Sequence, residues 1–159
     1  VAAATAATAA TAGDGDGASF YAHWQERLGS LVDALPLLSV ALPGTHDTLT
    51  YDLSERVADN ANNLPAWLAA TLHELAPQHV VGAFIREQAT TQALDVTAQL
   101  DAGVRFLDLR AVYSGGPALG DAYDWYGLHM LETNAKLTTY VRAVGAWARA
   151  HPRELVVAA

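Results

Sequence analysis

The sequence contains no cysteine, which excludes disulfide bonds, thiolate catalysis and cysteine-ligated zinc. Charged residues make up only 16% of the chain, and 17 acidic side chains outnumber 9 basic ones. The formal net charge of −8 argues against a general nucleic-acid binder, which needs a basic face, and against permanent adsorption to an anionic membrane. No run of about 18 apolar residues occurs, so no segment is predicted to span a bilayer. The cellular compartment stays open.

The chain does contain enough apolar material, 52% of 159 residues, to fill the core of one domain. Residues 1–18 are Ala/Thr repeats followed by a Gly-Asp-Gly-Asp-Gly run, which predicts a flexible leader. This run lacks the EF-hand pattern, so we interpret it as a linker and not as a calcium site. The chain begins with Val1 instead of Met, which indicates processing or excision from a longer protein. The folded domain is expected over residues 19–159.

Apolar spacing and turn signals predict the order of the elements. Strands are predicted at 37–41, 104–113, 125–130 and 154–159, helices at 19–28, 66–75, 88–102 and 133–151, and a loop at 114–121. Strand, helix, strand, loop, strand, helix, strand is the order typical of parallel strands joined by crossover helices. A full β/α barrel needs about 250 residues. The predicted fold class is therefore α/β, the N-terminal part, about half, of a TIM-type β/α barrel.

Two local features add detail to this order. The long excursion from residue 51 to 86 is typical of a functional loop or cap. Within it, Trp67 and Leu68 have two interpretations: burial in the core, which burial frequencies favour, and a membrane-touching edge. Gly103 predicts the end of the helix at 88–102, and the pair His151-Pro152 predicts the end of the last helix.

Polar residues capable of acid-base chemistry follow the predicted strands. The stretch Leu-Pro-Gly-Thr-His-Asp-Thr at 42–48 carries a Pro-Gly turn signal that places His46 and Asp47 side by side after the first strand. Asp108 and Arg110 lie in the strand predicted at 104–113, and His129 lies near the end of the next. In a β/α barrel the catalytic groups gather where strands end. We therefore predict that these five residues form one site.

Two histidines around an arginine suit the cleavage of a phosphodiester by an internal hydroxyl. A neutral imidazole takes the proton of the attacking hydroxyl, and a protonated one gives a proton to the leaving oxygen. The guanidinium matches phosphate oxygens and offsets the charge that grows in the transition state. Structural interpretations stay open beside this one. His46 could cap the turn and His129 could serve packing, while Asp108 and Arg110 could form a salt bridge that supports the strand.

Three motifs carry a family resemblance. They are Leu-Pro-Gly-Thr-His-Asp-Thr at 42–48, Gln-Leu-Asp-Ala-Gly-Val-Arg-Phe-Leu-Asp-Leu-Arg at 99–110, and His-Pro-Arg-Glu-Leu-Val-Val at 151–157. In this order they resemble the X region of phosphatidylinositol-specific phospholipases C, and above all the stand-alone X-domain-containing proteins and the bacterial enzymes. The resemblance covers roughly residues 35–159. It implies a β/α barrel with the X region as its first half, a phospholipid substrate, transient contact with a membrane surface, and a C-terminal barrel half that completes the fold.

The resemblance also implies roles for the five residues. His46 would be the general base on the inositol 2-hydroxyl, and His129 the general acid for the diacylglycerol leaving group. Arg110 would hold the phosphate, Asp47 would orient His129, and Asp108 would support the cluster. In the calcium-dependent signalling enzymes an asparagine follows the first histidine, and acidic residues stand at the positions of Asp108 and Arg110. This chain has Asp47 and Arg110 instead, which predicts chemistry without a metal or other cofactor.

The chain departs from the family pattern in two respects. Met130 follows His129 where the family usually has glycine. The acidic partner that orients the His46 equivalent belongs to the second barrel half, so residues 1–159 alone are expected to be inactive and poorly stable, with an unpaired strand edge. Two rival functions stay open: a catalytically inactive barrel that binds lipid or a partner, and a metal-dependent glycerophosphodiesterase-like enzyme. The latter would need an acidic ligand where Arg110 stands.

Overall fold

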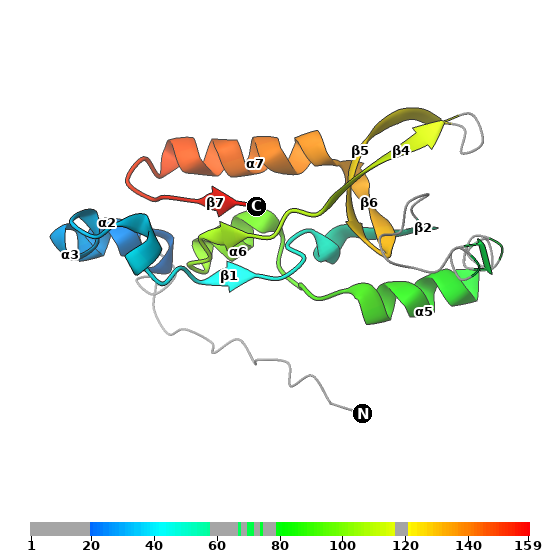
Figure 1. Ribbon diagram of the computed structural model, residues 1–159, viewed down its shortest axis with the longest axis horizontal. Coiled ribbons are helices and arrows are strands. Elements are labelled where there is room, and N and C mark those ends of the chain that lie inside the picture. Colours follow the sequence, from blue (N-terminus) through cyan, green and yellow to red (C-terminus); the bar gives the residue numbers. More distant parts are fainter. Residues whose placement is uncertain (1–19, 58–66, 68–69, 72–73, 75–78, 117–120) are drawn as a thin grey trace.

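The protein is described by a computed structural model that covers residues 20–57, 67, 70, 71, 74, 79–116 and 121–159. It is an elongated α/β molecule with two small sheets (Figure 1). Helices α2 (Trp24–Leu28) and α3 (Ser30–Asp33) lie at one end, and α5 (His79–Ala89) lies toward the other. The predicted leader lies outside the described residues. Within them, no helix has the length and apolar character needed to cross a membrane.

One sheet is parallel and matches the predicted crossover arrangement. Its strands follow the order β1 (Gly44–Thr45), β3 (Phe106–Leu107) and β7 (Val157–Ala158). Helices α6 (Val96–Asp101) and α7 (Leu137–Ala150) connect and cover these strands (Figure 1). Strand and helices share one apolar core, made of Ala22, Val96, Leu100, Leu107 and Trp147.

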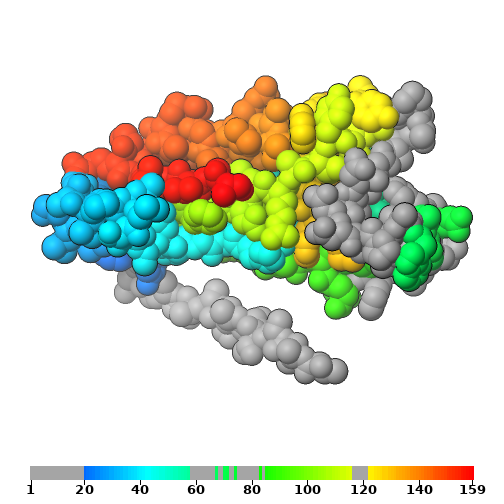
Figure 2. All heavy atoms as spheres, in the orientation of Figure 1, coloured from blue at the N-terminus to red at the C-terminus, as the bar shows by residue number. Residues whose placement is uncertain are grey.

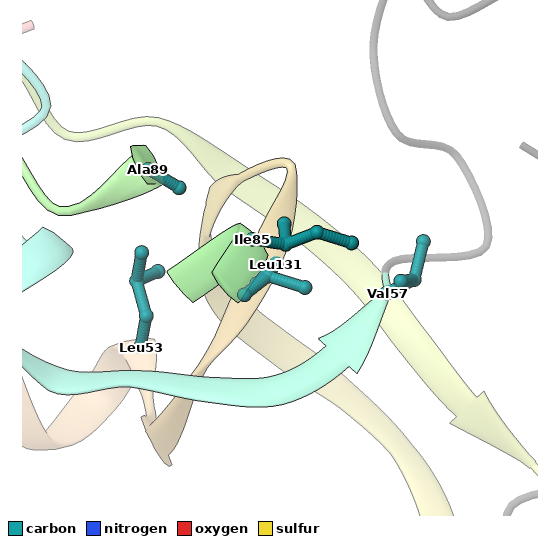
Figure 3. Packing of buried hydrophobic residues seen from close by; sticks show 5 residues of the cluster. All are labelled: Leu53, Val57, Ile85, Ala89 and Leu131. Carbon is teal, nitrogen blue, oxygen red and sulfur yellow. The ribbon is translucent and has the colours of Figure 1, made fainter. Parts of the chain in front are cut away.

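The second sheet is antiparallel, which the sequence did not predict. Its order is β2 (Leu53–Val57), β6 (Leu131–Lys136), β5 (Asp121–His129) and β4 (Ala111–Gly116). Helix α5 packs on it through the core residues Leu53, Val57, Ile85, Ala89 and Leu131 (Figure 3). The expectation of parallel strands alone is therefore wrong. The fold is mixed α/β, and the barrel half stays a prediction.

The first predicted strand is misplaced. Residues Leu37–Ser39 form a short 3₁₀ helix, η1, in which the Ser39 N–H donates to the Pro36 carbonyl at 2.8 Å. Leu38 is fully exposed, so this apolar run is not a buried strand. The strand begins at Gly44, where the backbone meets β3 in register with Phe106.

The helix predicted at 88–102 consists of two helices. Helix α5 ends at Ala89, and α6 begins after Asp95, whose side chain accepts a hydrogen bond from the Ala98 N–H at 2.8 Å. Such a cap satisfies one of the free N–H groups of the first turn, which explains the separate start. The predicted stop is confirmed, because Gly103 adopts φ +100° just after α6. Residues 90–95, between the two helices, are not helical, and Thr91 and Gln92 among them contact the candidate site.

Three further boundaries differ from prediction because strand pairing overrides local pattern. The strand predicted at 104–113 is divided between the two sheets, with residues 108–110 crossing from β3 to β4. The loop predicted at 114–121 is shorter, since β4 and β5 extend into it. The last helix begins at Leu137 and not at 133, because β6 pairs with β2 and β5. Its end at His151 is confirmed.

The interpretation of Trp67 as a core residue is wrong. This residue lies in a helical conformation, as do 70, 71 and 74, which agrees with the helix predicted there. The Trp67 side chain is 69% exposed. Leu68 lies outside the described residues.

A buried ion pair joins the N-terminal helices to the parallel sheet. The side chains of Arg105 and Glu154 have no exposed surface, and Arg105 Nη2 lies 2.7 Å from Glu154 Oε2. Arg105 also donates to the carbonyls of Leu100 and Ala22. Glu154 accepts the Glu26 N–H at 2.9 Å. Each charge thus has partners that replace water, and removing one side chain of the pair would leave the other charge buried without its partner.

We predict that Arg105→Ala lowers the free energy of unfolding by about 3–5 kcal/mol, because it leaves Glu154 buried and uncompensated. Urea denaturation monitored by circular dichroism measures this change. The control is Arg153→Ala: this side chain is 56% exposed, and its Nε lies 3.7 Å from Glu26 Oε1. Such a surface pair is worth about 0–1 kcal/mol. Equal losses in the two variants would contradict the structural role of Arg105.

Candidate active site

The site centres on Asp47, the second residue of the predicted His-Asp turn. Its side chain has no exposed surface. Three cationic or ionisable groups reach its carboxylate: Arg110 Nε lies 2.9 Å from Oδ1, while His46 Nε2 and His129 Nε2 lie 2.9 Å and 3.4 Å from Oδ2. The backbone of Asp47 is left-handed, with φ +50°, a conformation that Asp and Asn tolerate better than most residues. The turn thus buries a carboxylate that all three groups share.

Asp108, the residue directly after β3, holds this turn in place. The Asp47 N–H donates to Asp108 Oδ2 at 3.1 Å, and the Thr48 N–H donates to the Asp108 carbonyl at 3.0 Å. In return, the Asp108 N–H reaches the Thr45 carbonyl at 3.4 Å. The carboxylate and the backbone of Asp108 therefore both fix the turn at the end of the parallel sheet.

Arg110 follows Asp108 in the segment that crosses between the sheets. Its Nη2 lies 3.2 Å from Asp108 Oδ2, and 3.3 Å from His46 Nδ1. Desolvation would raise the pKa of Asp108, but the Asp47 N–H, the Arg110 guanidinium and His46 outweigh it and lower this pKa below its usual value. The guanidinium thus lies over both carboxylates, Asp47 and Asp108, while 46% of its side chain stays exposed.

His129 ends β5 and reaches the site from the antiparallel sheet. Its Nδ1 lies 2.7 Å from the Ala89 carbonyl, which can only accept, so Nδ1 carries a proton and Nε2 faces Asp47. Met130 follows in the left-handed region, with φ +62°, at the tight link between β5 and β6. This conformation favours glycine, so the backbone at Met130 is strained.

The two imidazoles face one another across the site. Their ring centroids are 6.4 Å apart, with an angle of 70° between the ring planes. The His46 side chain is 64% exposed and that of His129 is 26% exposed, whereas Asp47 beneath them is buried. Asp47, Asp108 and Arg110 also line a small depression together with Leu49 and with Leu53 and Leu128 of the antiparallel sheet. The His46 ring and the Arg110 guanidinium are thus open to solvent, and the His129 ring is partly so.

Sequence reasoning missed a polar clamp on the turn. The His46 carbonyl accepts from Thr91 Oγ1 at 2.9 Å and from Gln92 Nε2 at 2.8 Å. Thr91 Oγ1 is within 2.8 Å of Thr50 Oγ1, and Gln99 Nε2 donates to the Thr48 carbonyl at 2.9 Å. The helix predicted at 88–102 includes Thr91 and Gln92, and a helical pattern does not indicate that their side chains contact a distant turn.

One group of residues has the donor set for a metal ion. Ligand atoms of His46, Asp47 and Asp108 all lie within 4.8 Å of one another. Carboxylate oxygens and an imidazole nitrogen are suitable donors for a divalent cation. Arg110 contacts both of the carboxylates, so its positive charge already occupies the position that favours a cation. The residues present fit a guanidinium better than a metal ion.

All five residues predicted from the sequence are brought together: His46, Asp47, Asp108, Arg110 and His129. The interpretation of Asp108 and Arg110 as a salt bridge is confirmed as well, since they do pair. The pair does not merely support a strand, because both residues lie outside β3 and β4 and contact the turn.

Comparison with known proteins finds relatives by sequence. No family model matches the chain. A mouse protein named PI-PLC X domain-containing protein 1 is 34% identical over 155 residues, which are 98% of this chain and 42% of the relative. The human protein of the same name is 33% identical over 86% of this chain and 40% of its own length, and human PI-PLC X domain-containing protein 2 is 27% identical over 85% and 41%. The chain spans about two fifths of the length of these curated relatives.

Solved structures show the same fold. Two structures of the phosphatidylinositol-specific phospholipase C of S. aureus match with TM-scores of 0.53 and 0.55, at 20% and 19% identity. They cover 87% and 89% of this chain, but only 34% and 35% of the bacterial chains. The resemblance carried by the three motifs is confirmed: over most of its length this chain is similar to the PI-PLC X domain-containing proteins, and its fold is that of part of a bacterial phosphatidylinositol-specific phospholipase C.

Proposed function

We propose that this chain carries the catalytic groups of a phosphodiesterase of the phospholipase C type, which cleaves a phosphoinositide-type phosphodiester. The observation that supports the proposal is the shared position of two imidazoles and one guanidinium around the buried carboxylate of Asp47. A phosphodiester needs one group to remove a proton, one to supply a proton and one to hold its charge. His46, His129 and Arg110 are the three groups in this site that can do so.

In the proposed reaction, His46 acts as the general base. It removes the proton of the substrate hydroxyl next to the phosphodiester, and the oxygen of that hydroxyl forms a bond to phosphorus. The bond from phosphorus to the diacylglycerol oxygen breaks, and His129 donates the proton that this oxygen takes up. His46 is the more exposed ring, which suits contact with a hydroxyl of the headgroup. Its Nε2 lies 2.9 Å from Asp47 Oδ2 and its Nδ1 lies 3.2 Å from Asp108 Oδ2, so the substrate hydroxyl displaces one of these carboxylates when it reaches a ring nitrogen. Water can later open the cyclic phosphate, with the two histidines exchanging roles.

Arg110 holds the phosphate and replaces the charge of a metal ion. Its guanidinium matches phosphate oxygens, and its position over Asp47 and Asp108 fixes its direction. Asp47 orients Arg110 and both rings from below, while Asp108 fixes the turn and Arg110. The acidic partner expected for His46 in a C-terminal barrel half stays part of the proposal, as does transient contact with a membrane surface.

A rival proposal is supported by the grouping of His46, Asp47 and Asp108, whose ligand atoms are close enough for a divalent cation. A metal-dependent glycerophosphodiesterase-like enzyme would place its cation there. The direct contacts of Arg110 with both carboxylates favour the enzyme without a metal. The other rival, an inactive barrel that binds lipid or a partner, keeps the same geometry and differs only in turnover.

We predict that His46→Ala and His129→Ala each lower kcat by a factor of about 10²–10⁴, the usual contribution of a general acid or base. The measurement is release of diacylglycerol from phosphatidylinositol vesicles by the intact protein. His23→Ala is the control, since His23 pairs with Glu26 away from the site. Wild-type protein that binds the vesicles without turnover would instead favour the inactive lipid-binding barrel.

A second prediction concerns the electrostatic role of Arg110. Arg110→Gln should raise the pKa of Asp108, because it removes a charge that stabilises the carboxylate. Carbon-detected NMR titration of the carboxyl groups measures the change. Asp124 is an internal control: Lys136 lowers its pKa, and Arg110→Gln should leave it unchanged.

The lowered pKa of Asp108 also has a consequence for stability. Because the folded-state pKa lies below the usual 3.8, Asp108 contributes stability above about pH 3.8 that is lost as the pH falls through the lower folded value. Arg110→Gln raises the folded-state pKa toward the unfolded value, so the part of the acid-induced loss that Asp108 contributes should be smaller in the variant and complete at a higher pH. Unchanged titration of Asp108 in this variant would contradict the role assigned to Arg110.

A third prediction separates the two enzyme mechanisms. With Arg110 in place, turnover by the intact protein should be equal in EDTA and in calcium or magnesium. Arg110→Ala should lower kcat by about 10²–10³-fold, as expected for removal of one group that stabilises the developing charge. Activity that appears only on adding a divalent cation to the wild type would overturn the proposal and favour the metal-dependent rival.

A further inference from the structure

The end of helix α5 and the residues directly after it contact both histidines of the candidate site. The green chain that leaves α5 passes beside the cyan chain that follows β1 (Figures 1 and 2). The Ala89 carbonyl lies 2.7 Å from Nδ1 of His129. Two residues later, Thr91 Oγ1 and Gln92 Nε2 donate to the His46 carbonyl at 2.9 Å and 2.8 Å. We call Thr91 and Gln92 the clamp.

The end of the helix provides the anchor for one ring. Helix α5 ends at Ala89, so the carbonyl of this residue has no N–H group of a further helical turn to accept. It accepts from the His129 ring instead, and Ala89 itself is fully buried in the apolar cluster with Leu53 and Leu131 (Figure 3). Because such interiors are close-packed, the direction of the His129 ring is set from a rigid point.

A buried hydroxyl fixes the direction of the hydrogen bonds to His46. Thr50 is 2% exposed, and its Oγ1 accepts the N–H groups of Thr91 and Gln92 at 3.0 Å and 3.1 Å. A hydroxyl has two acceptor sites and one proton, so the Thr50 proton goes to Thr91 Oγ1, which is 2.8 Å away. The Thr91 proton then goes to the His46 carbonyl. The hydrogen bonds thus run in one direction, from the backbone of the clamp to the candidate base.

Other residues already hold the turn, so the clamp is not needed to form it. Gln99 donates to the Thr48 carbonyl at 2.9 Å, and Asp108 accepts the Asp47 N–H at 3.1 Å. The clamp instead brings two donors to a single carbonyl, that of His46. Two donors on the residue that carries one of the two rings favour a role in placing that ring.

The separation of the two imidazoles matters for the rate. Cleavage by an internal hydroxyl needs one imidazole at the attacking oxygen and the other at the leaving oxygen. The ring centroids of His46 and His129 are 6.4 Å apart. A displacement of about 1 Å in such an arrangement can lower the rate by about 10²-fold. A segment that contacts both residues keeps their separation constant, and all of its contacts lie within the described part of the chain.

We propose that the clamp is a positioning element that holds His46 at a fixed distance from His129. The Ala89 carbonyl anchors the second ring, while Thr91 and Gln92 hold the backbone that carries the first. This inference rests on the proposed function and deepens it by naming residues that affect the rate through His46. The clamp contributes to kcat and not to substrate affinity, because it contacts the His46 backbone and leaves the phosphate to Arg110.

The test compares the intact wild type with Thr91→Val/Gln92→Met, in which apolar groups of similar size replace both donors. Kinetics are measured on a monomeric, water-soluble inositol phosphodiester, so that binding to an interface does not enter KM. We expect kcat to fall about 10²-fold, the effect of a displaced catalytic group, while KM stays unchanged. Restoring one donor in Thr91→Ser/Gln92→Met should recover most of kcat.

Thr90→Val is the matched control. It removes the hydroxyl of the neighbouring residue, which donates to the Arg86 carbonyl at 2.7 Å, and it should leave kcat unchanged. Thermal unfolding followed by circular dichroism shows the temperature range in which each variant is folded, and kinetics are measured within that range. If the double variant does not fold, Thr91→Val and Gln92→Met each keep one donor, and each should lower kcat relative to Thr90→Val.

A change of leaving group shows which ring is displaced. A nitrophenolate leaves without a proton, so a nitrophenyl ester of inositol phosphate needs the general base but not the general acid. The loss in the double variant should persist with this ester, whereas the loss in His129→Ala should largely disappear. A loss in the double variant that disappears with the nitrophenyl ester would place the fault at His129 and overturn the proposal.

Two other outcomes would overturn the proposal: a folded double variant with the kcat of Thr90→Val, or a raised KM with unchanged kcat, which would mean that the clamp binds substrate. Failure of the proposed function has a different signature. In that case the wild type turns over neither ester, yet NMR relaxation still shows the His46 amide to be more mobile in the double variant than in the wild type and in Thr90→Val. Unchanged mobility of this amide would overturn the positioning role as well.

Discussion

The carboxylate of Asp47 is buried, and a charge without water is stable only when other groups replace the water it has lost. Arg110, His46 and His129 compensate its charge as ion pairs at 2.9 to 3.4 Å, while no described residue makes a well-aligned hydrogen bond to either oxygen. They come from three separate parts of the chain, so one buried charge is compensated by residues that are distant from one another in the sequence. Asp108 strengthens the arrangement, since it holds both the N–H of Asp47 and the guanidinium of Arg110.

Each sheet supplies a different part of the site. The parallel sheet ends in the His46-Asp47 turn and in Asp108, while the antiparallel sheet supplies His129 at the end of β5. Arg110 lies in the short segment between β3 and β4, where the chain passes from one sheet to the other. The site therefore depends on the relative placement of the sheets, and the clamp of Thr91 and Gln92 on the His46 carbonyl stabilises that junction.

The sequence by itself determined that helices cross over between parallel strands, and it predicted five residues that the structure brings together in the candidate site. A Pro-Gly turn after an apolar run placed His46 and Asp47 at a strand end, and strong local signals correctly ended helices at Gly103 and His151. These features are local, since they depend on backbone preferences within a few residues. The family resemblance rested on motifs of the same kind.

Only the tertiary structure decided how the elements pair. The antiparallel sheet, the division of residues 104–113 between two sheets and the strand at Leu131–Lys136 all depend on partners far away in the sequence. The burial of Arg105 against Glu154, and the contacts of Thr91 with the turn, are likewise invisible in a local pattern. Pairing between distant segments is set by packing and by the need to satisfy buried polar groups, and neither is encoded in the spacing of residues along one segment.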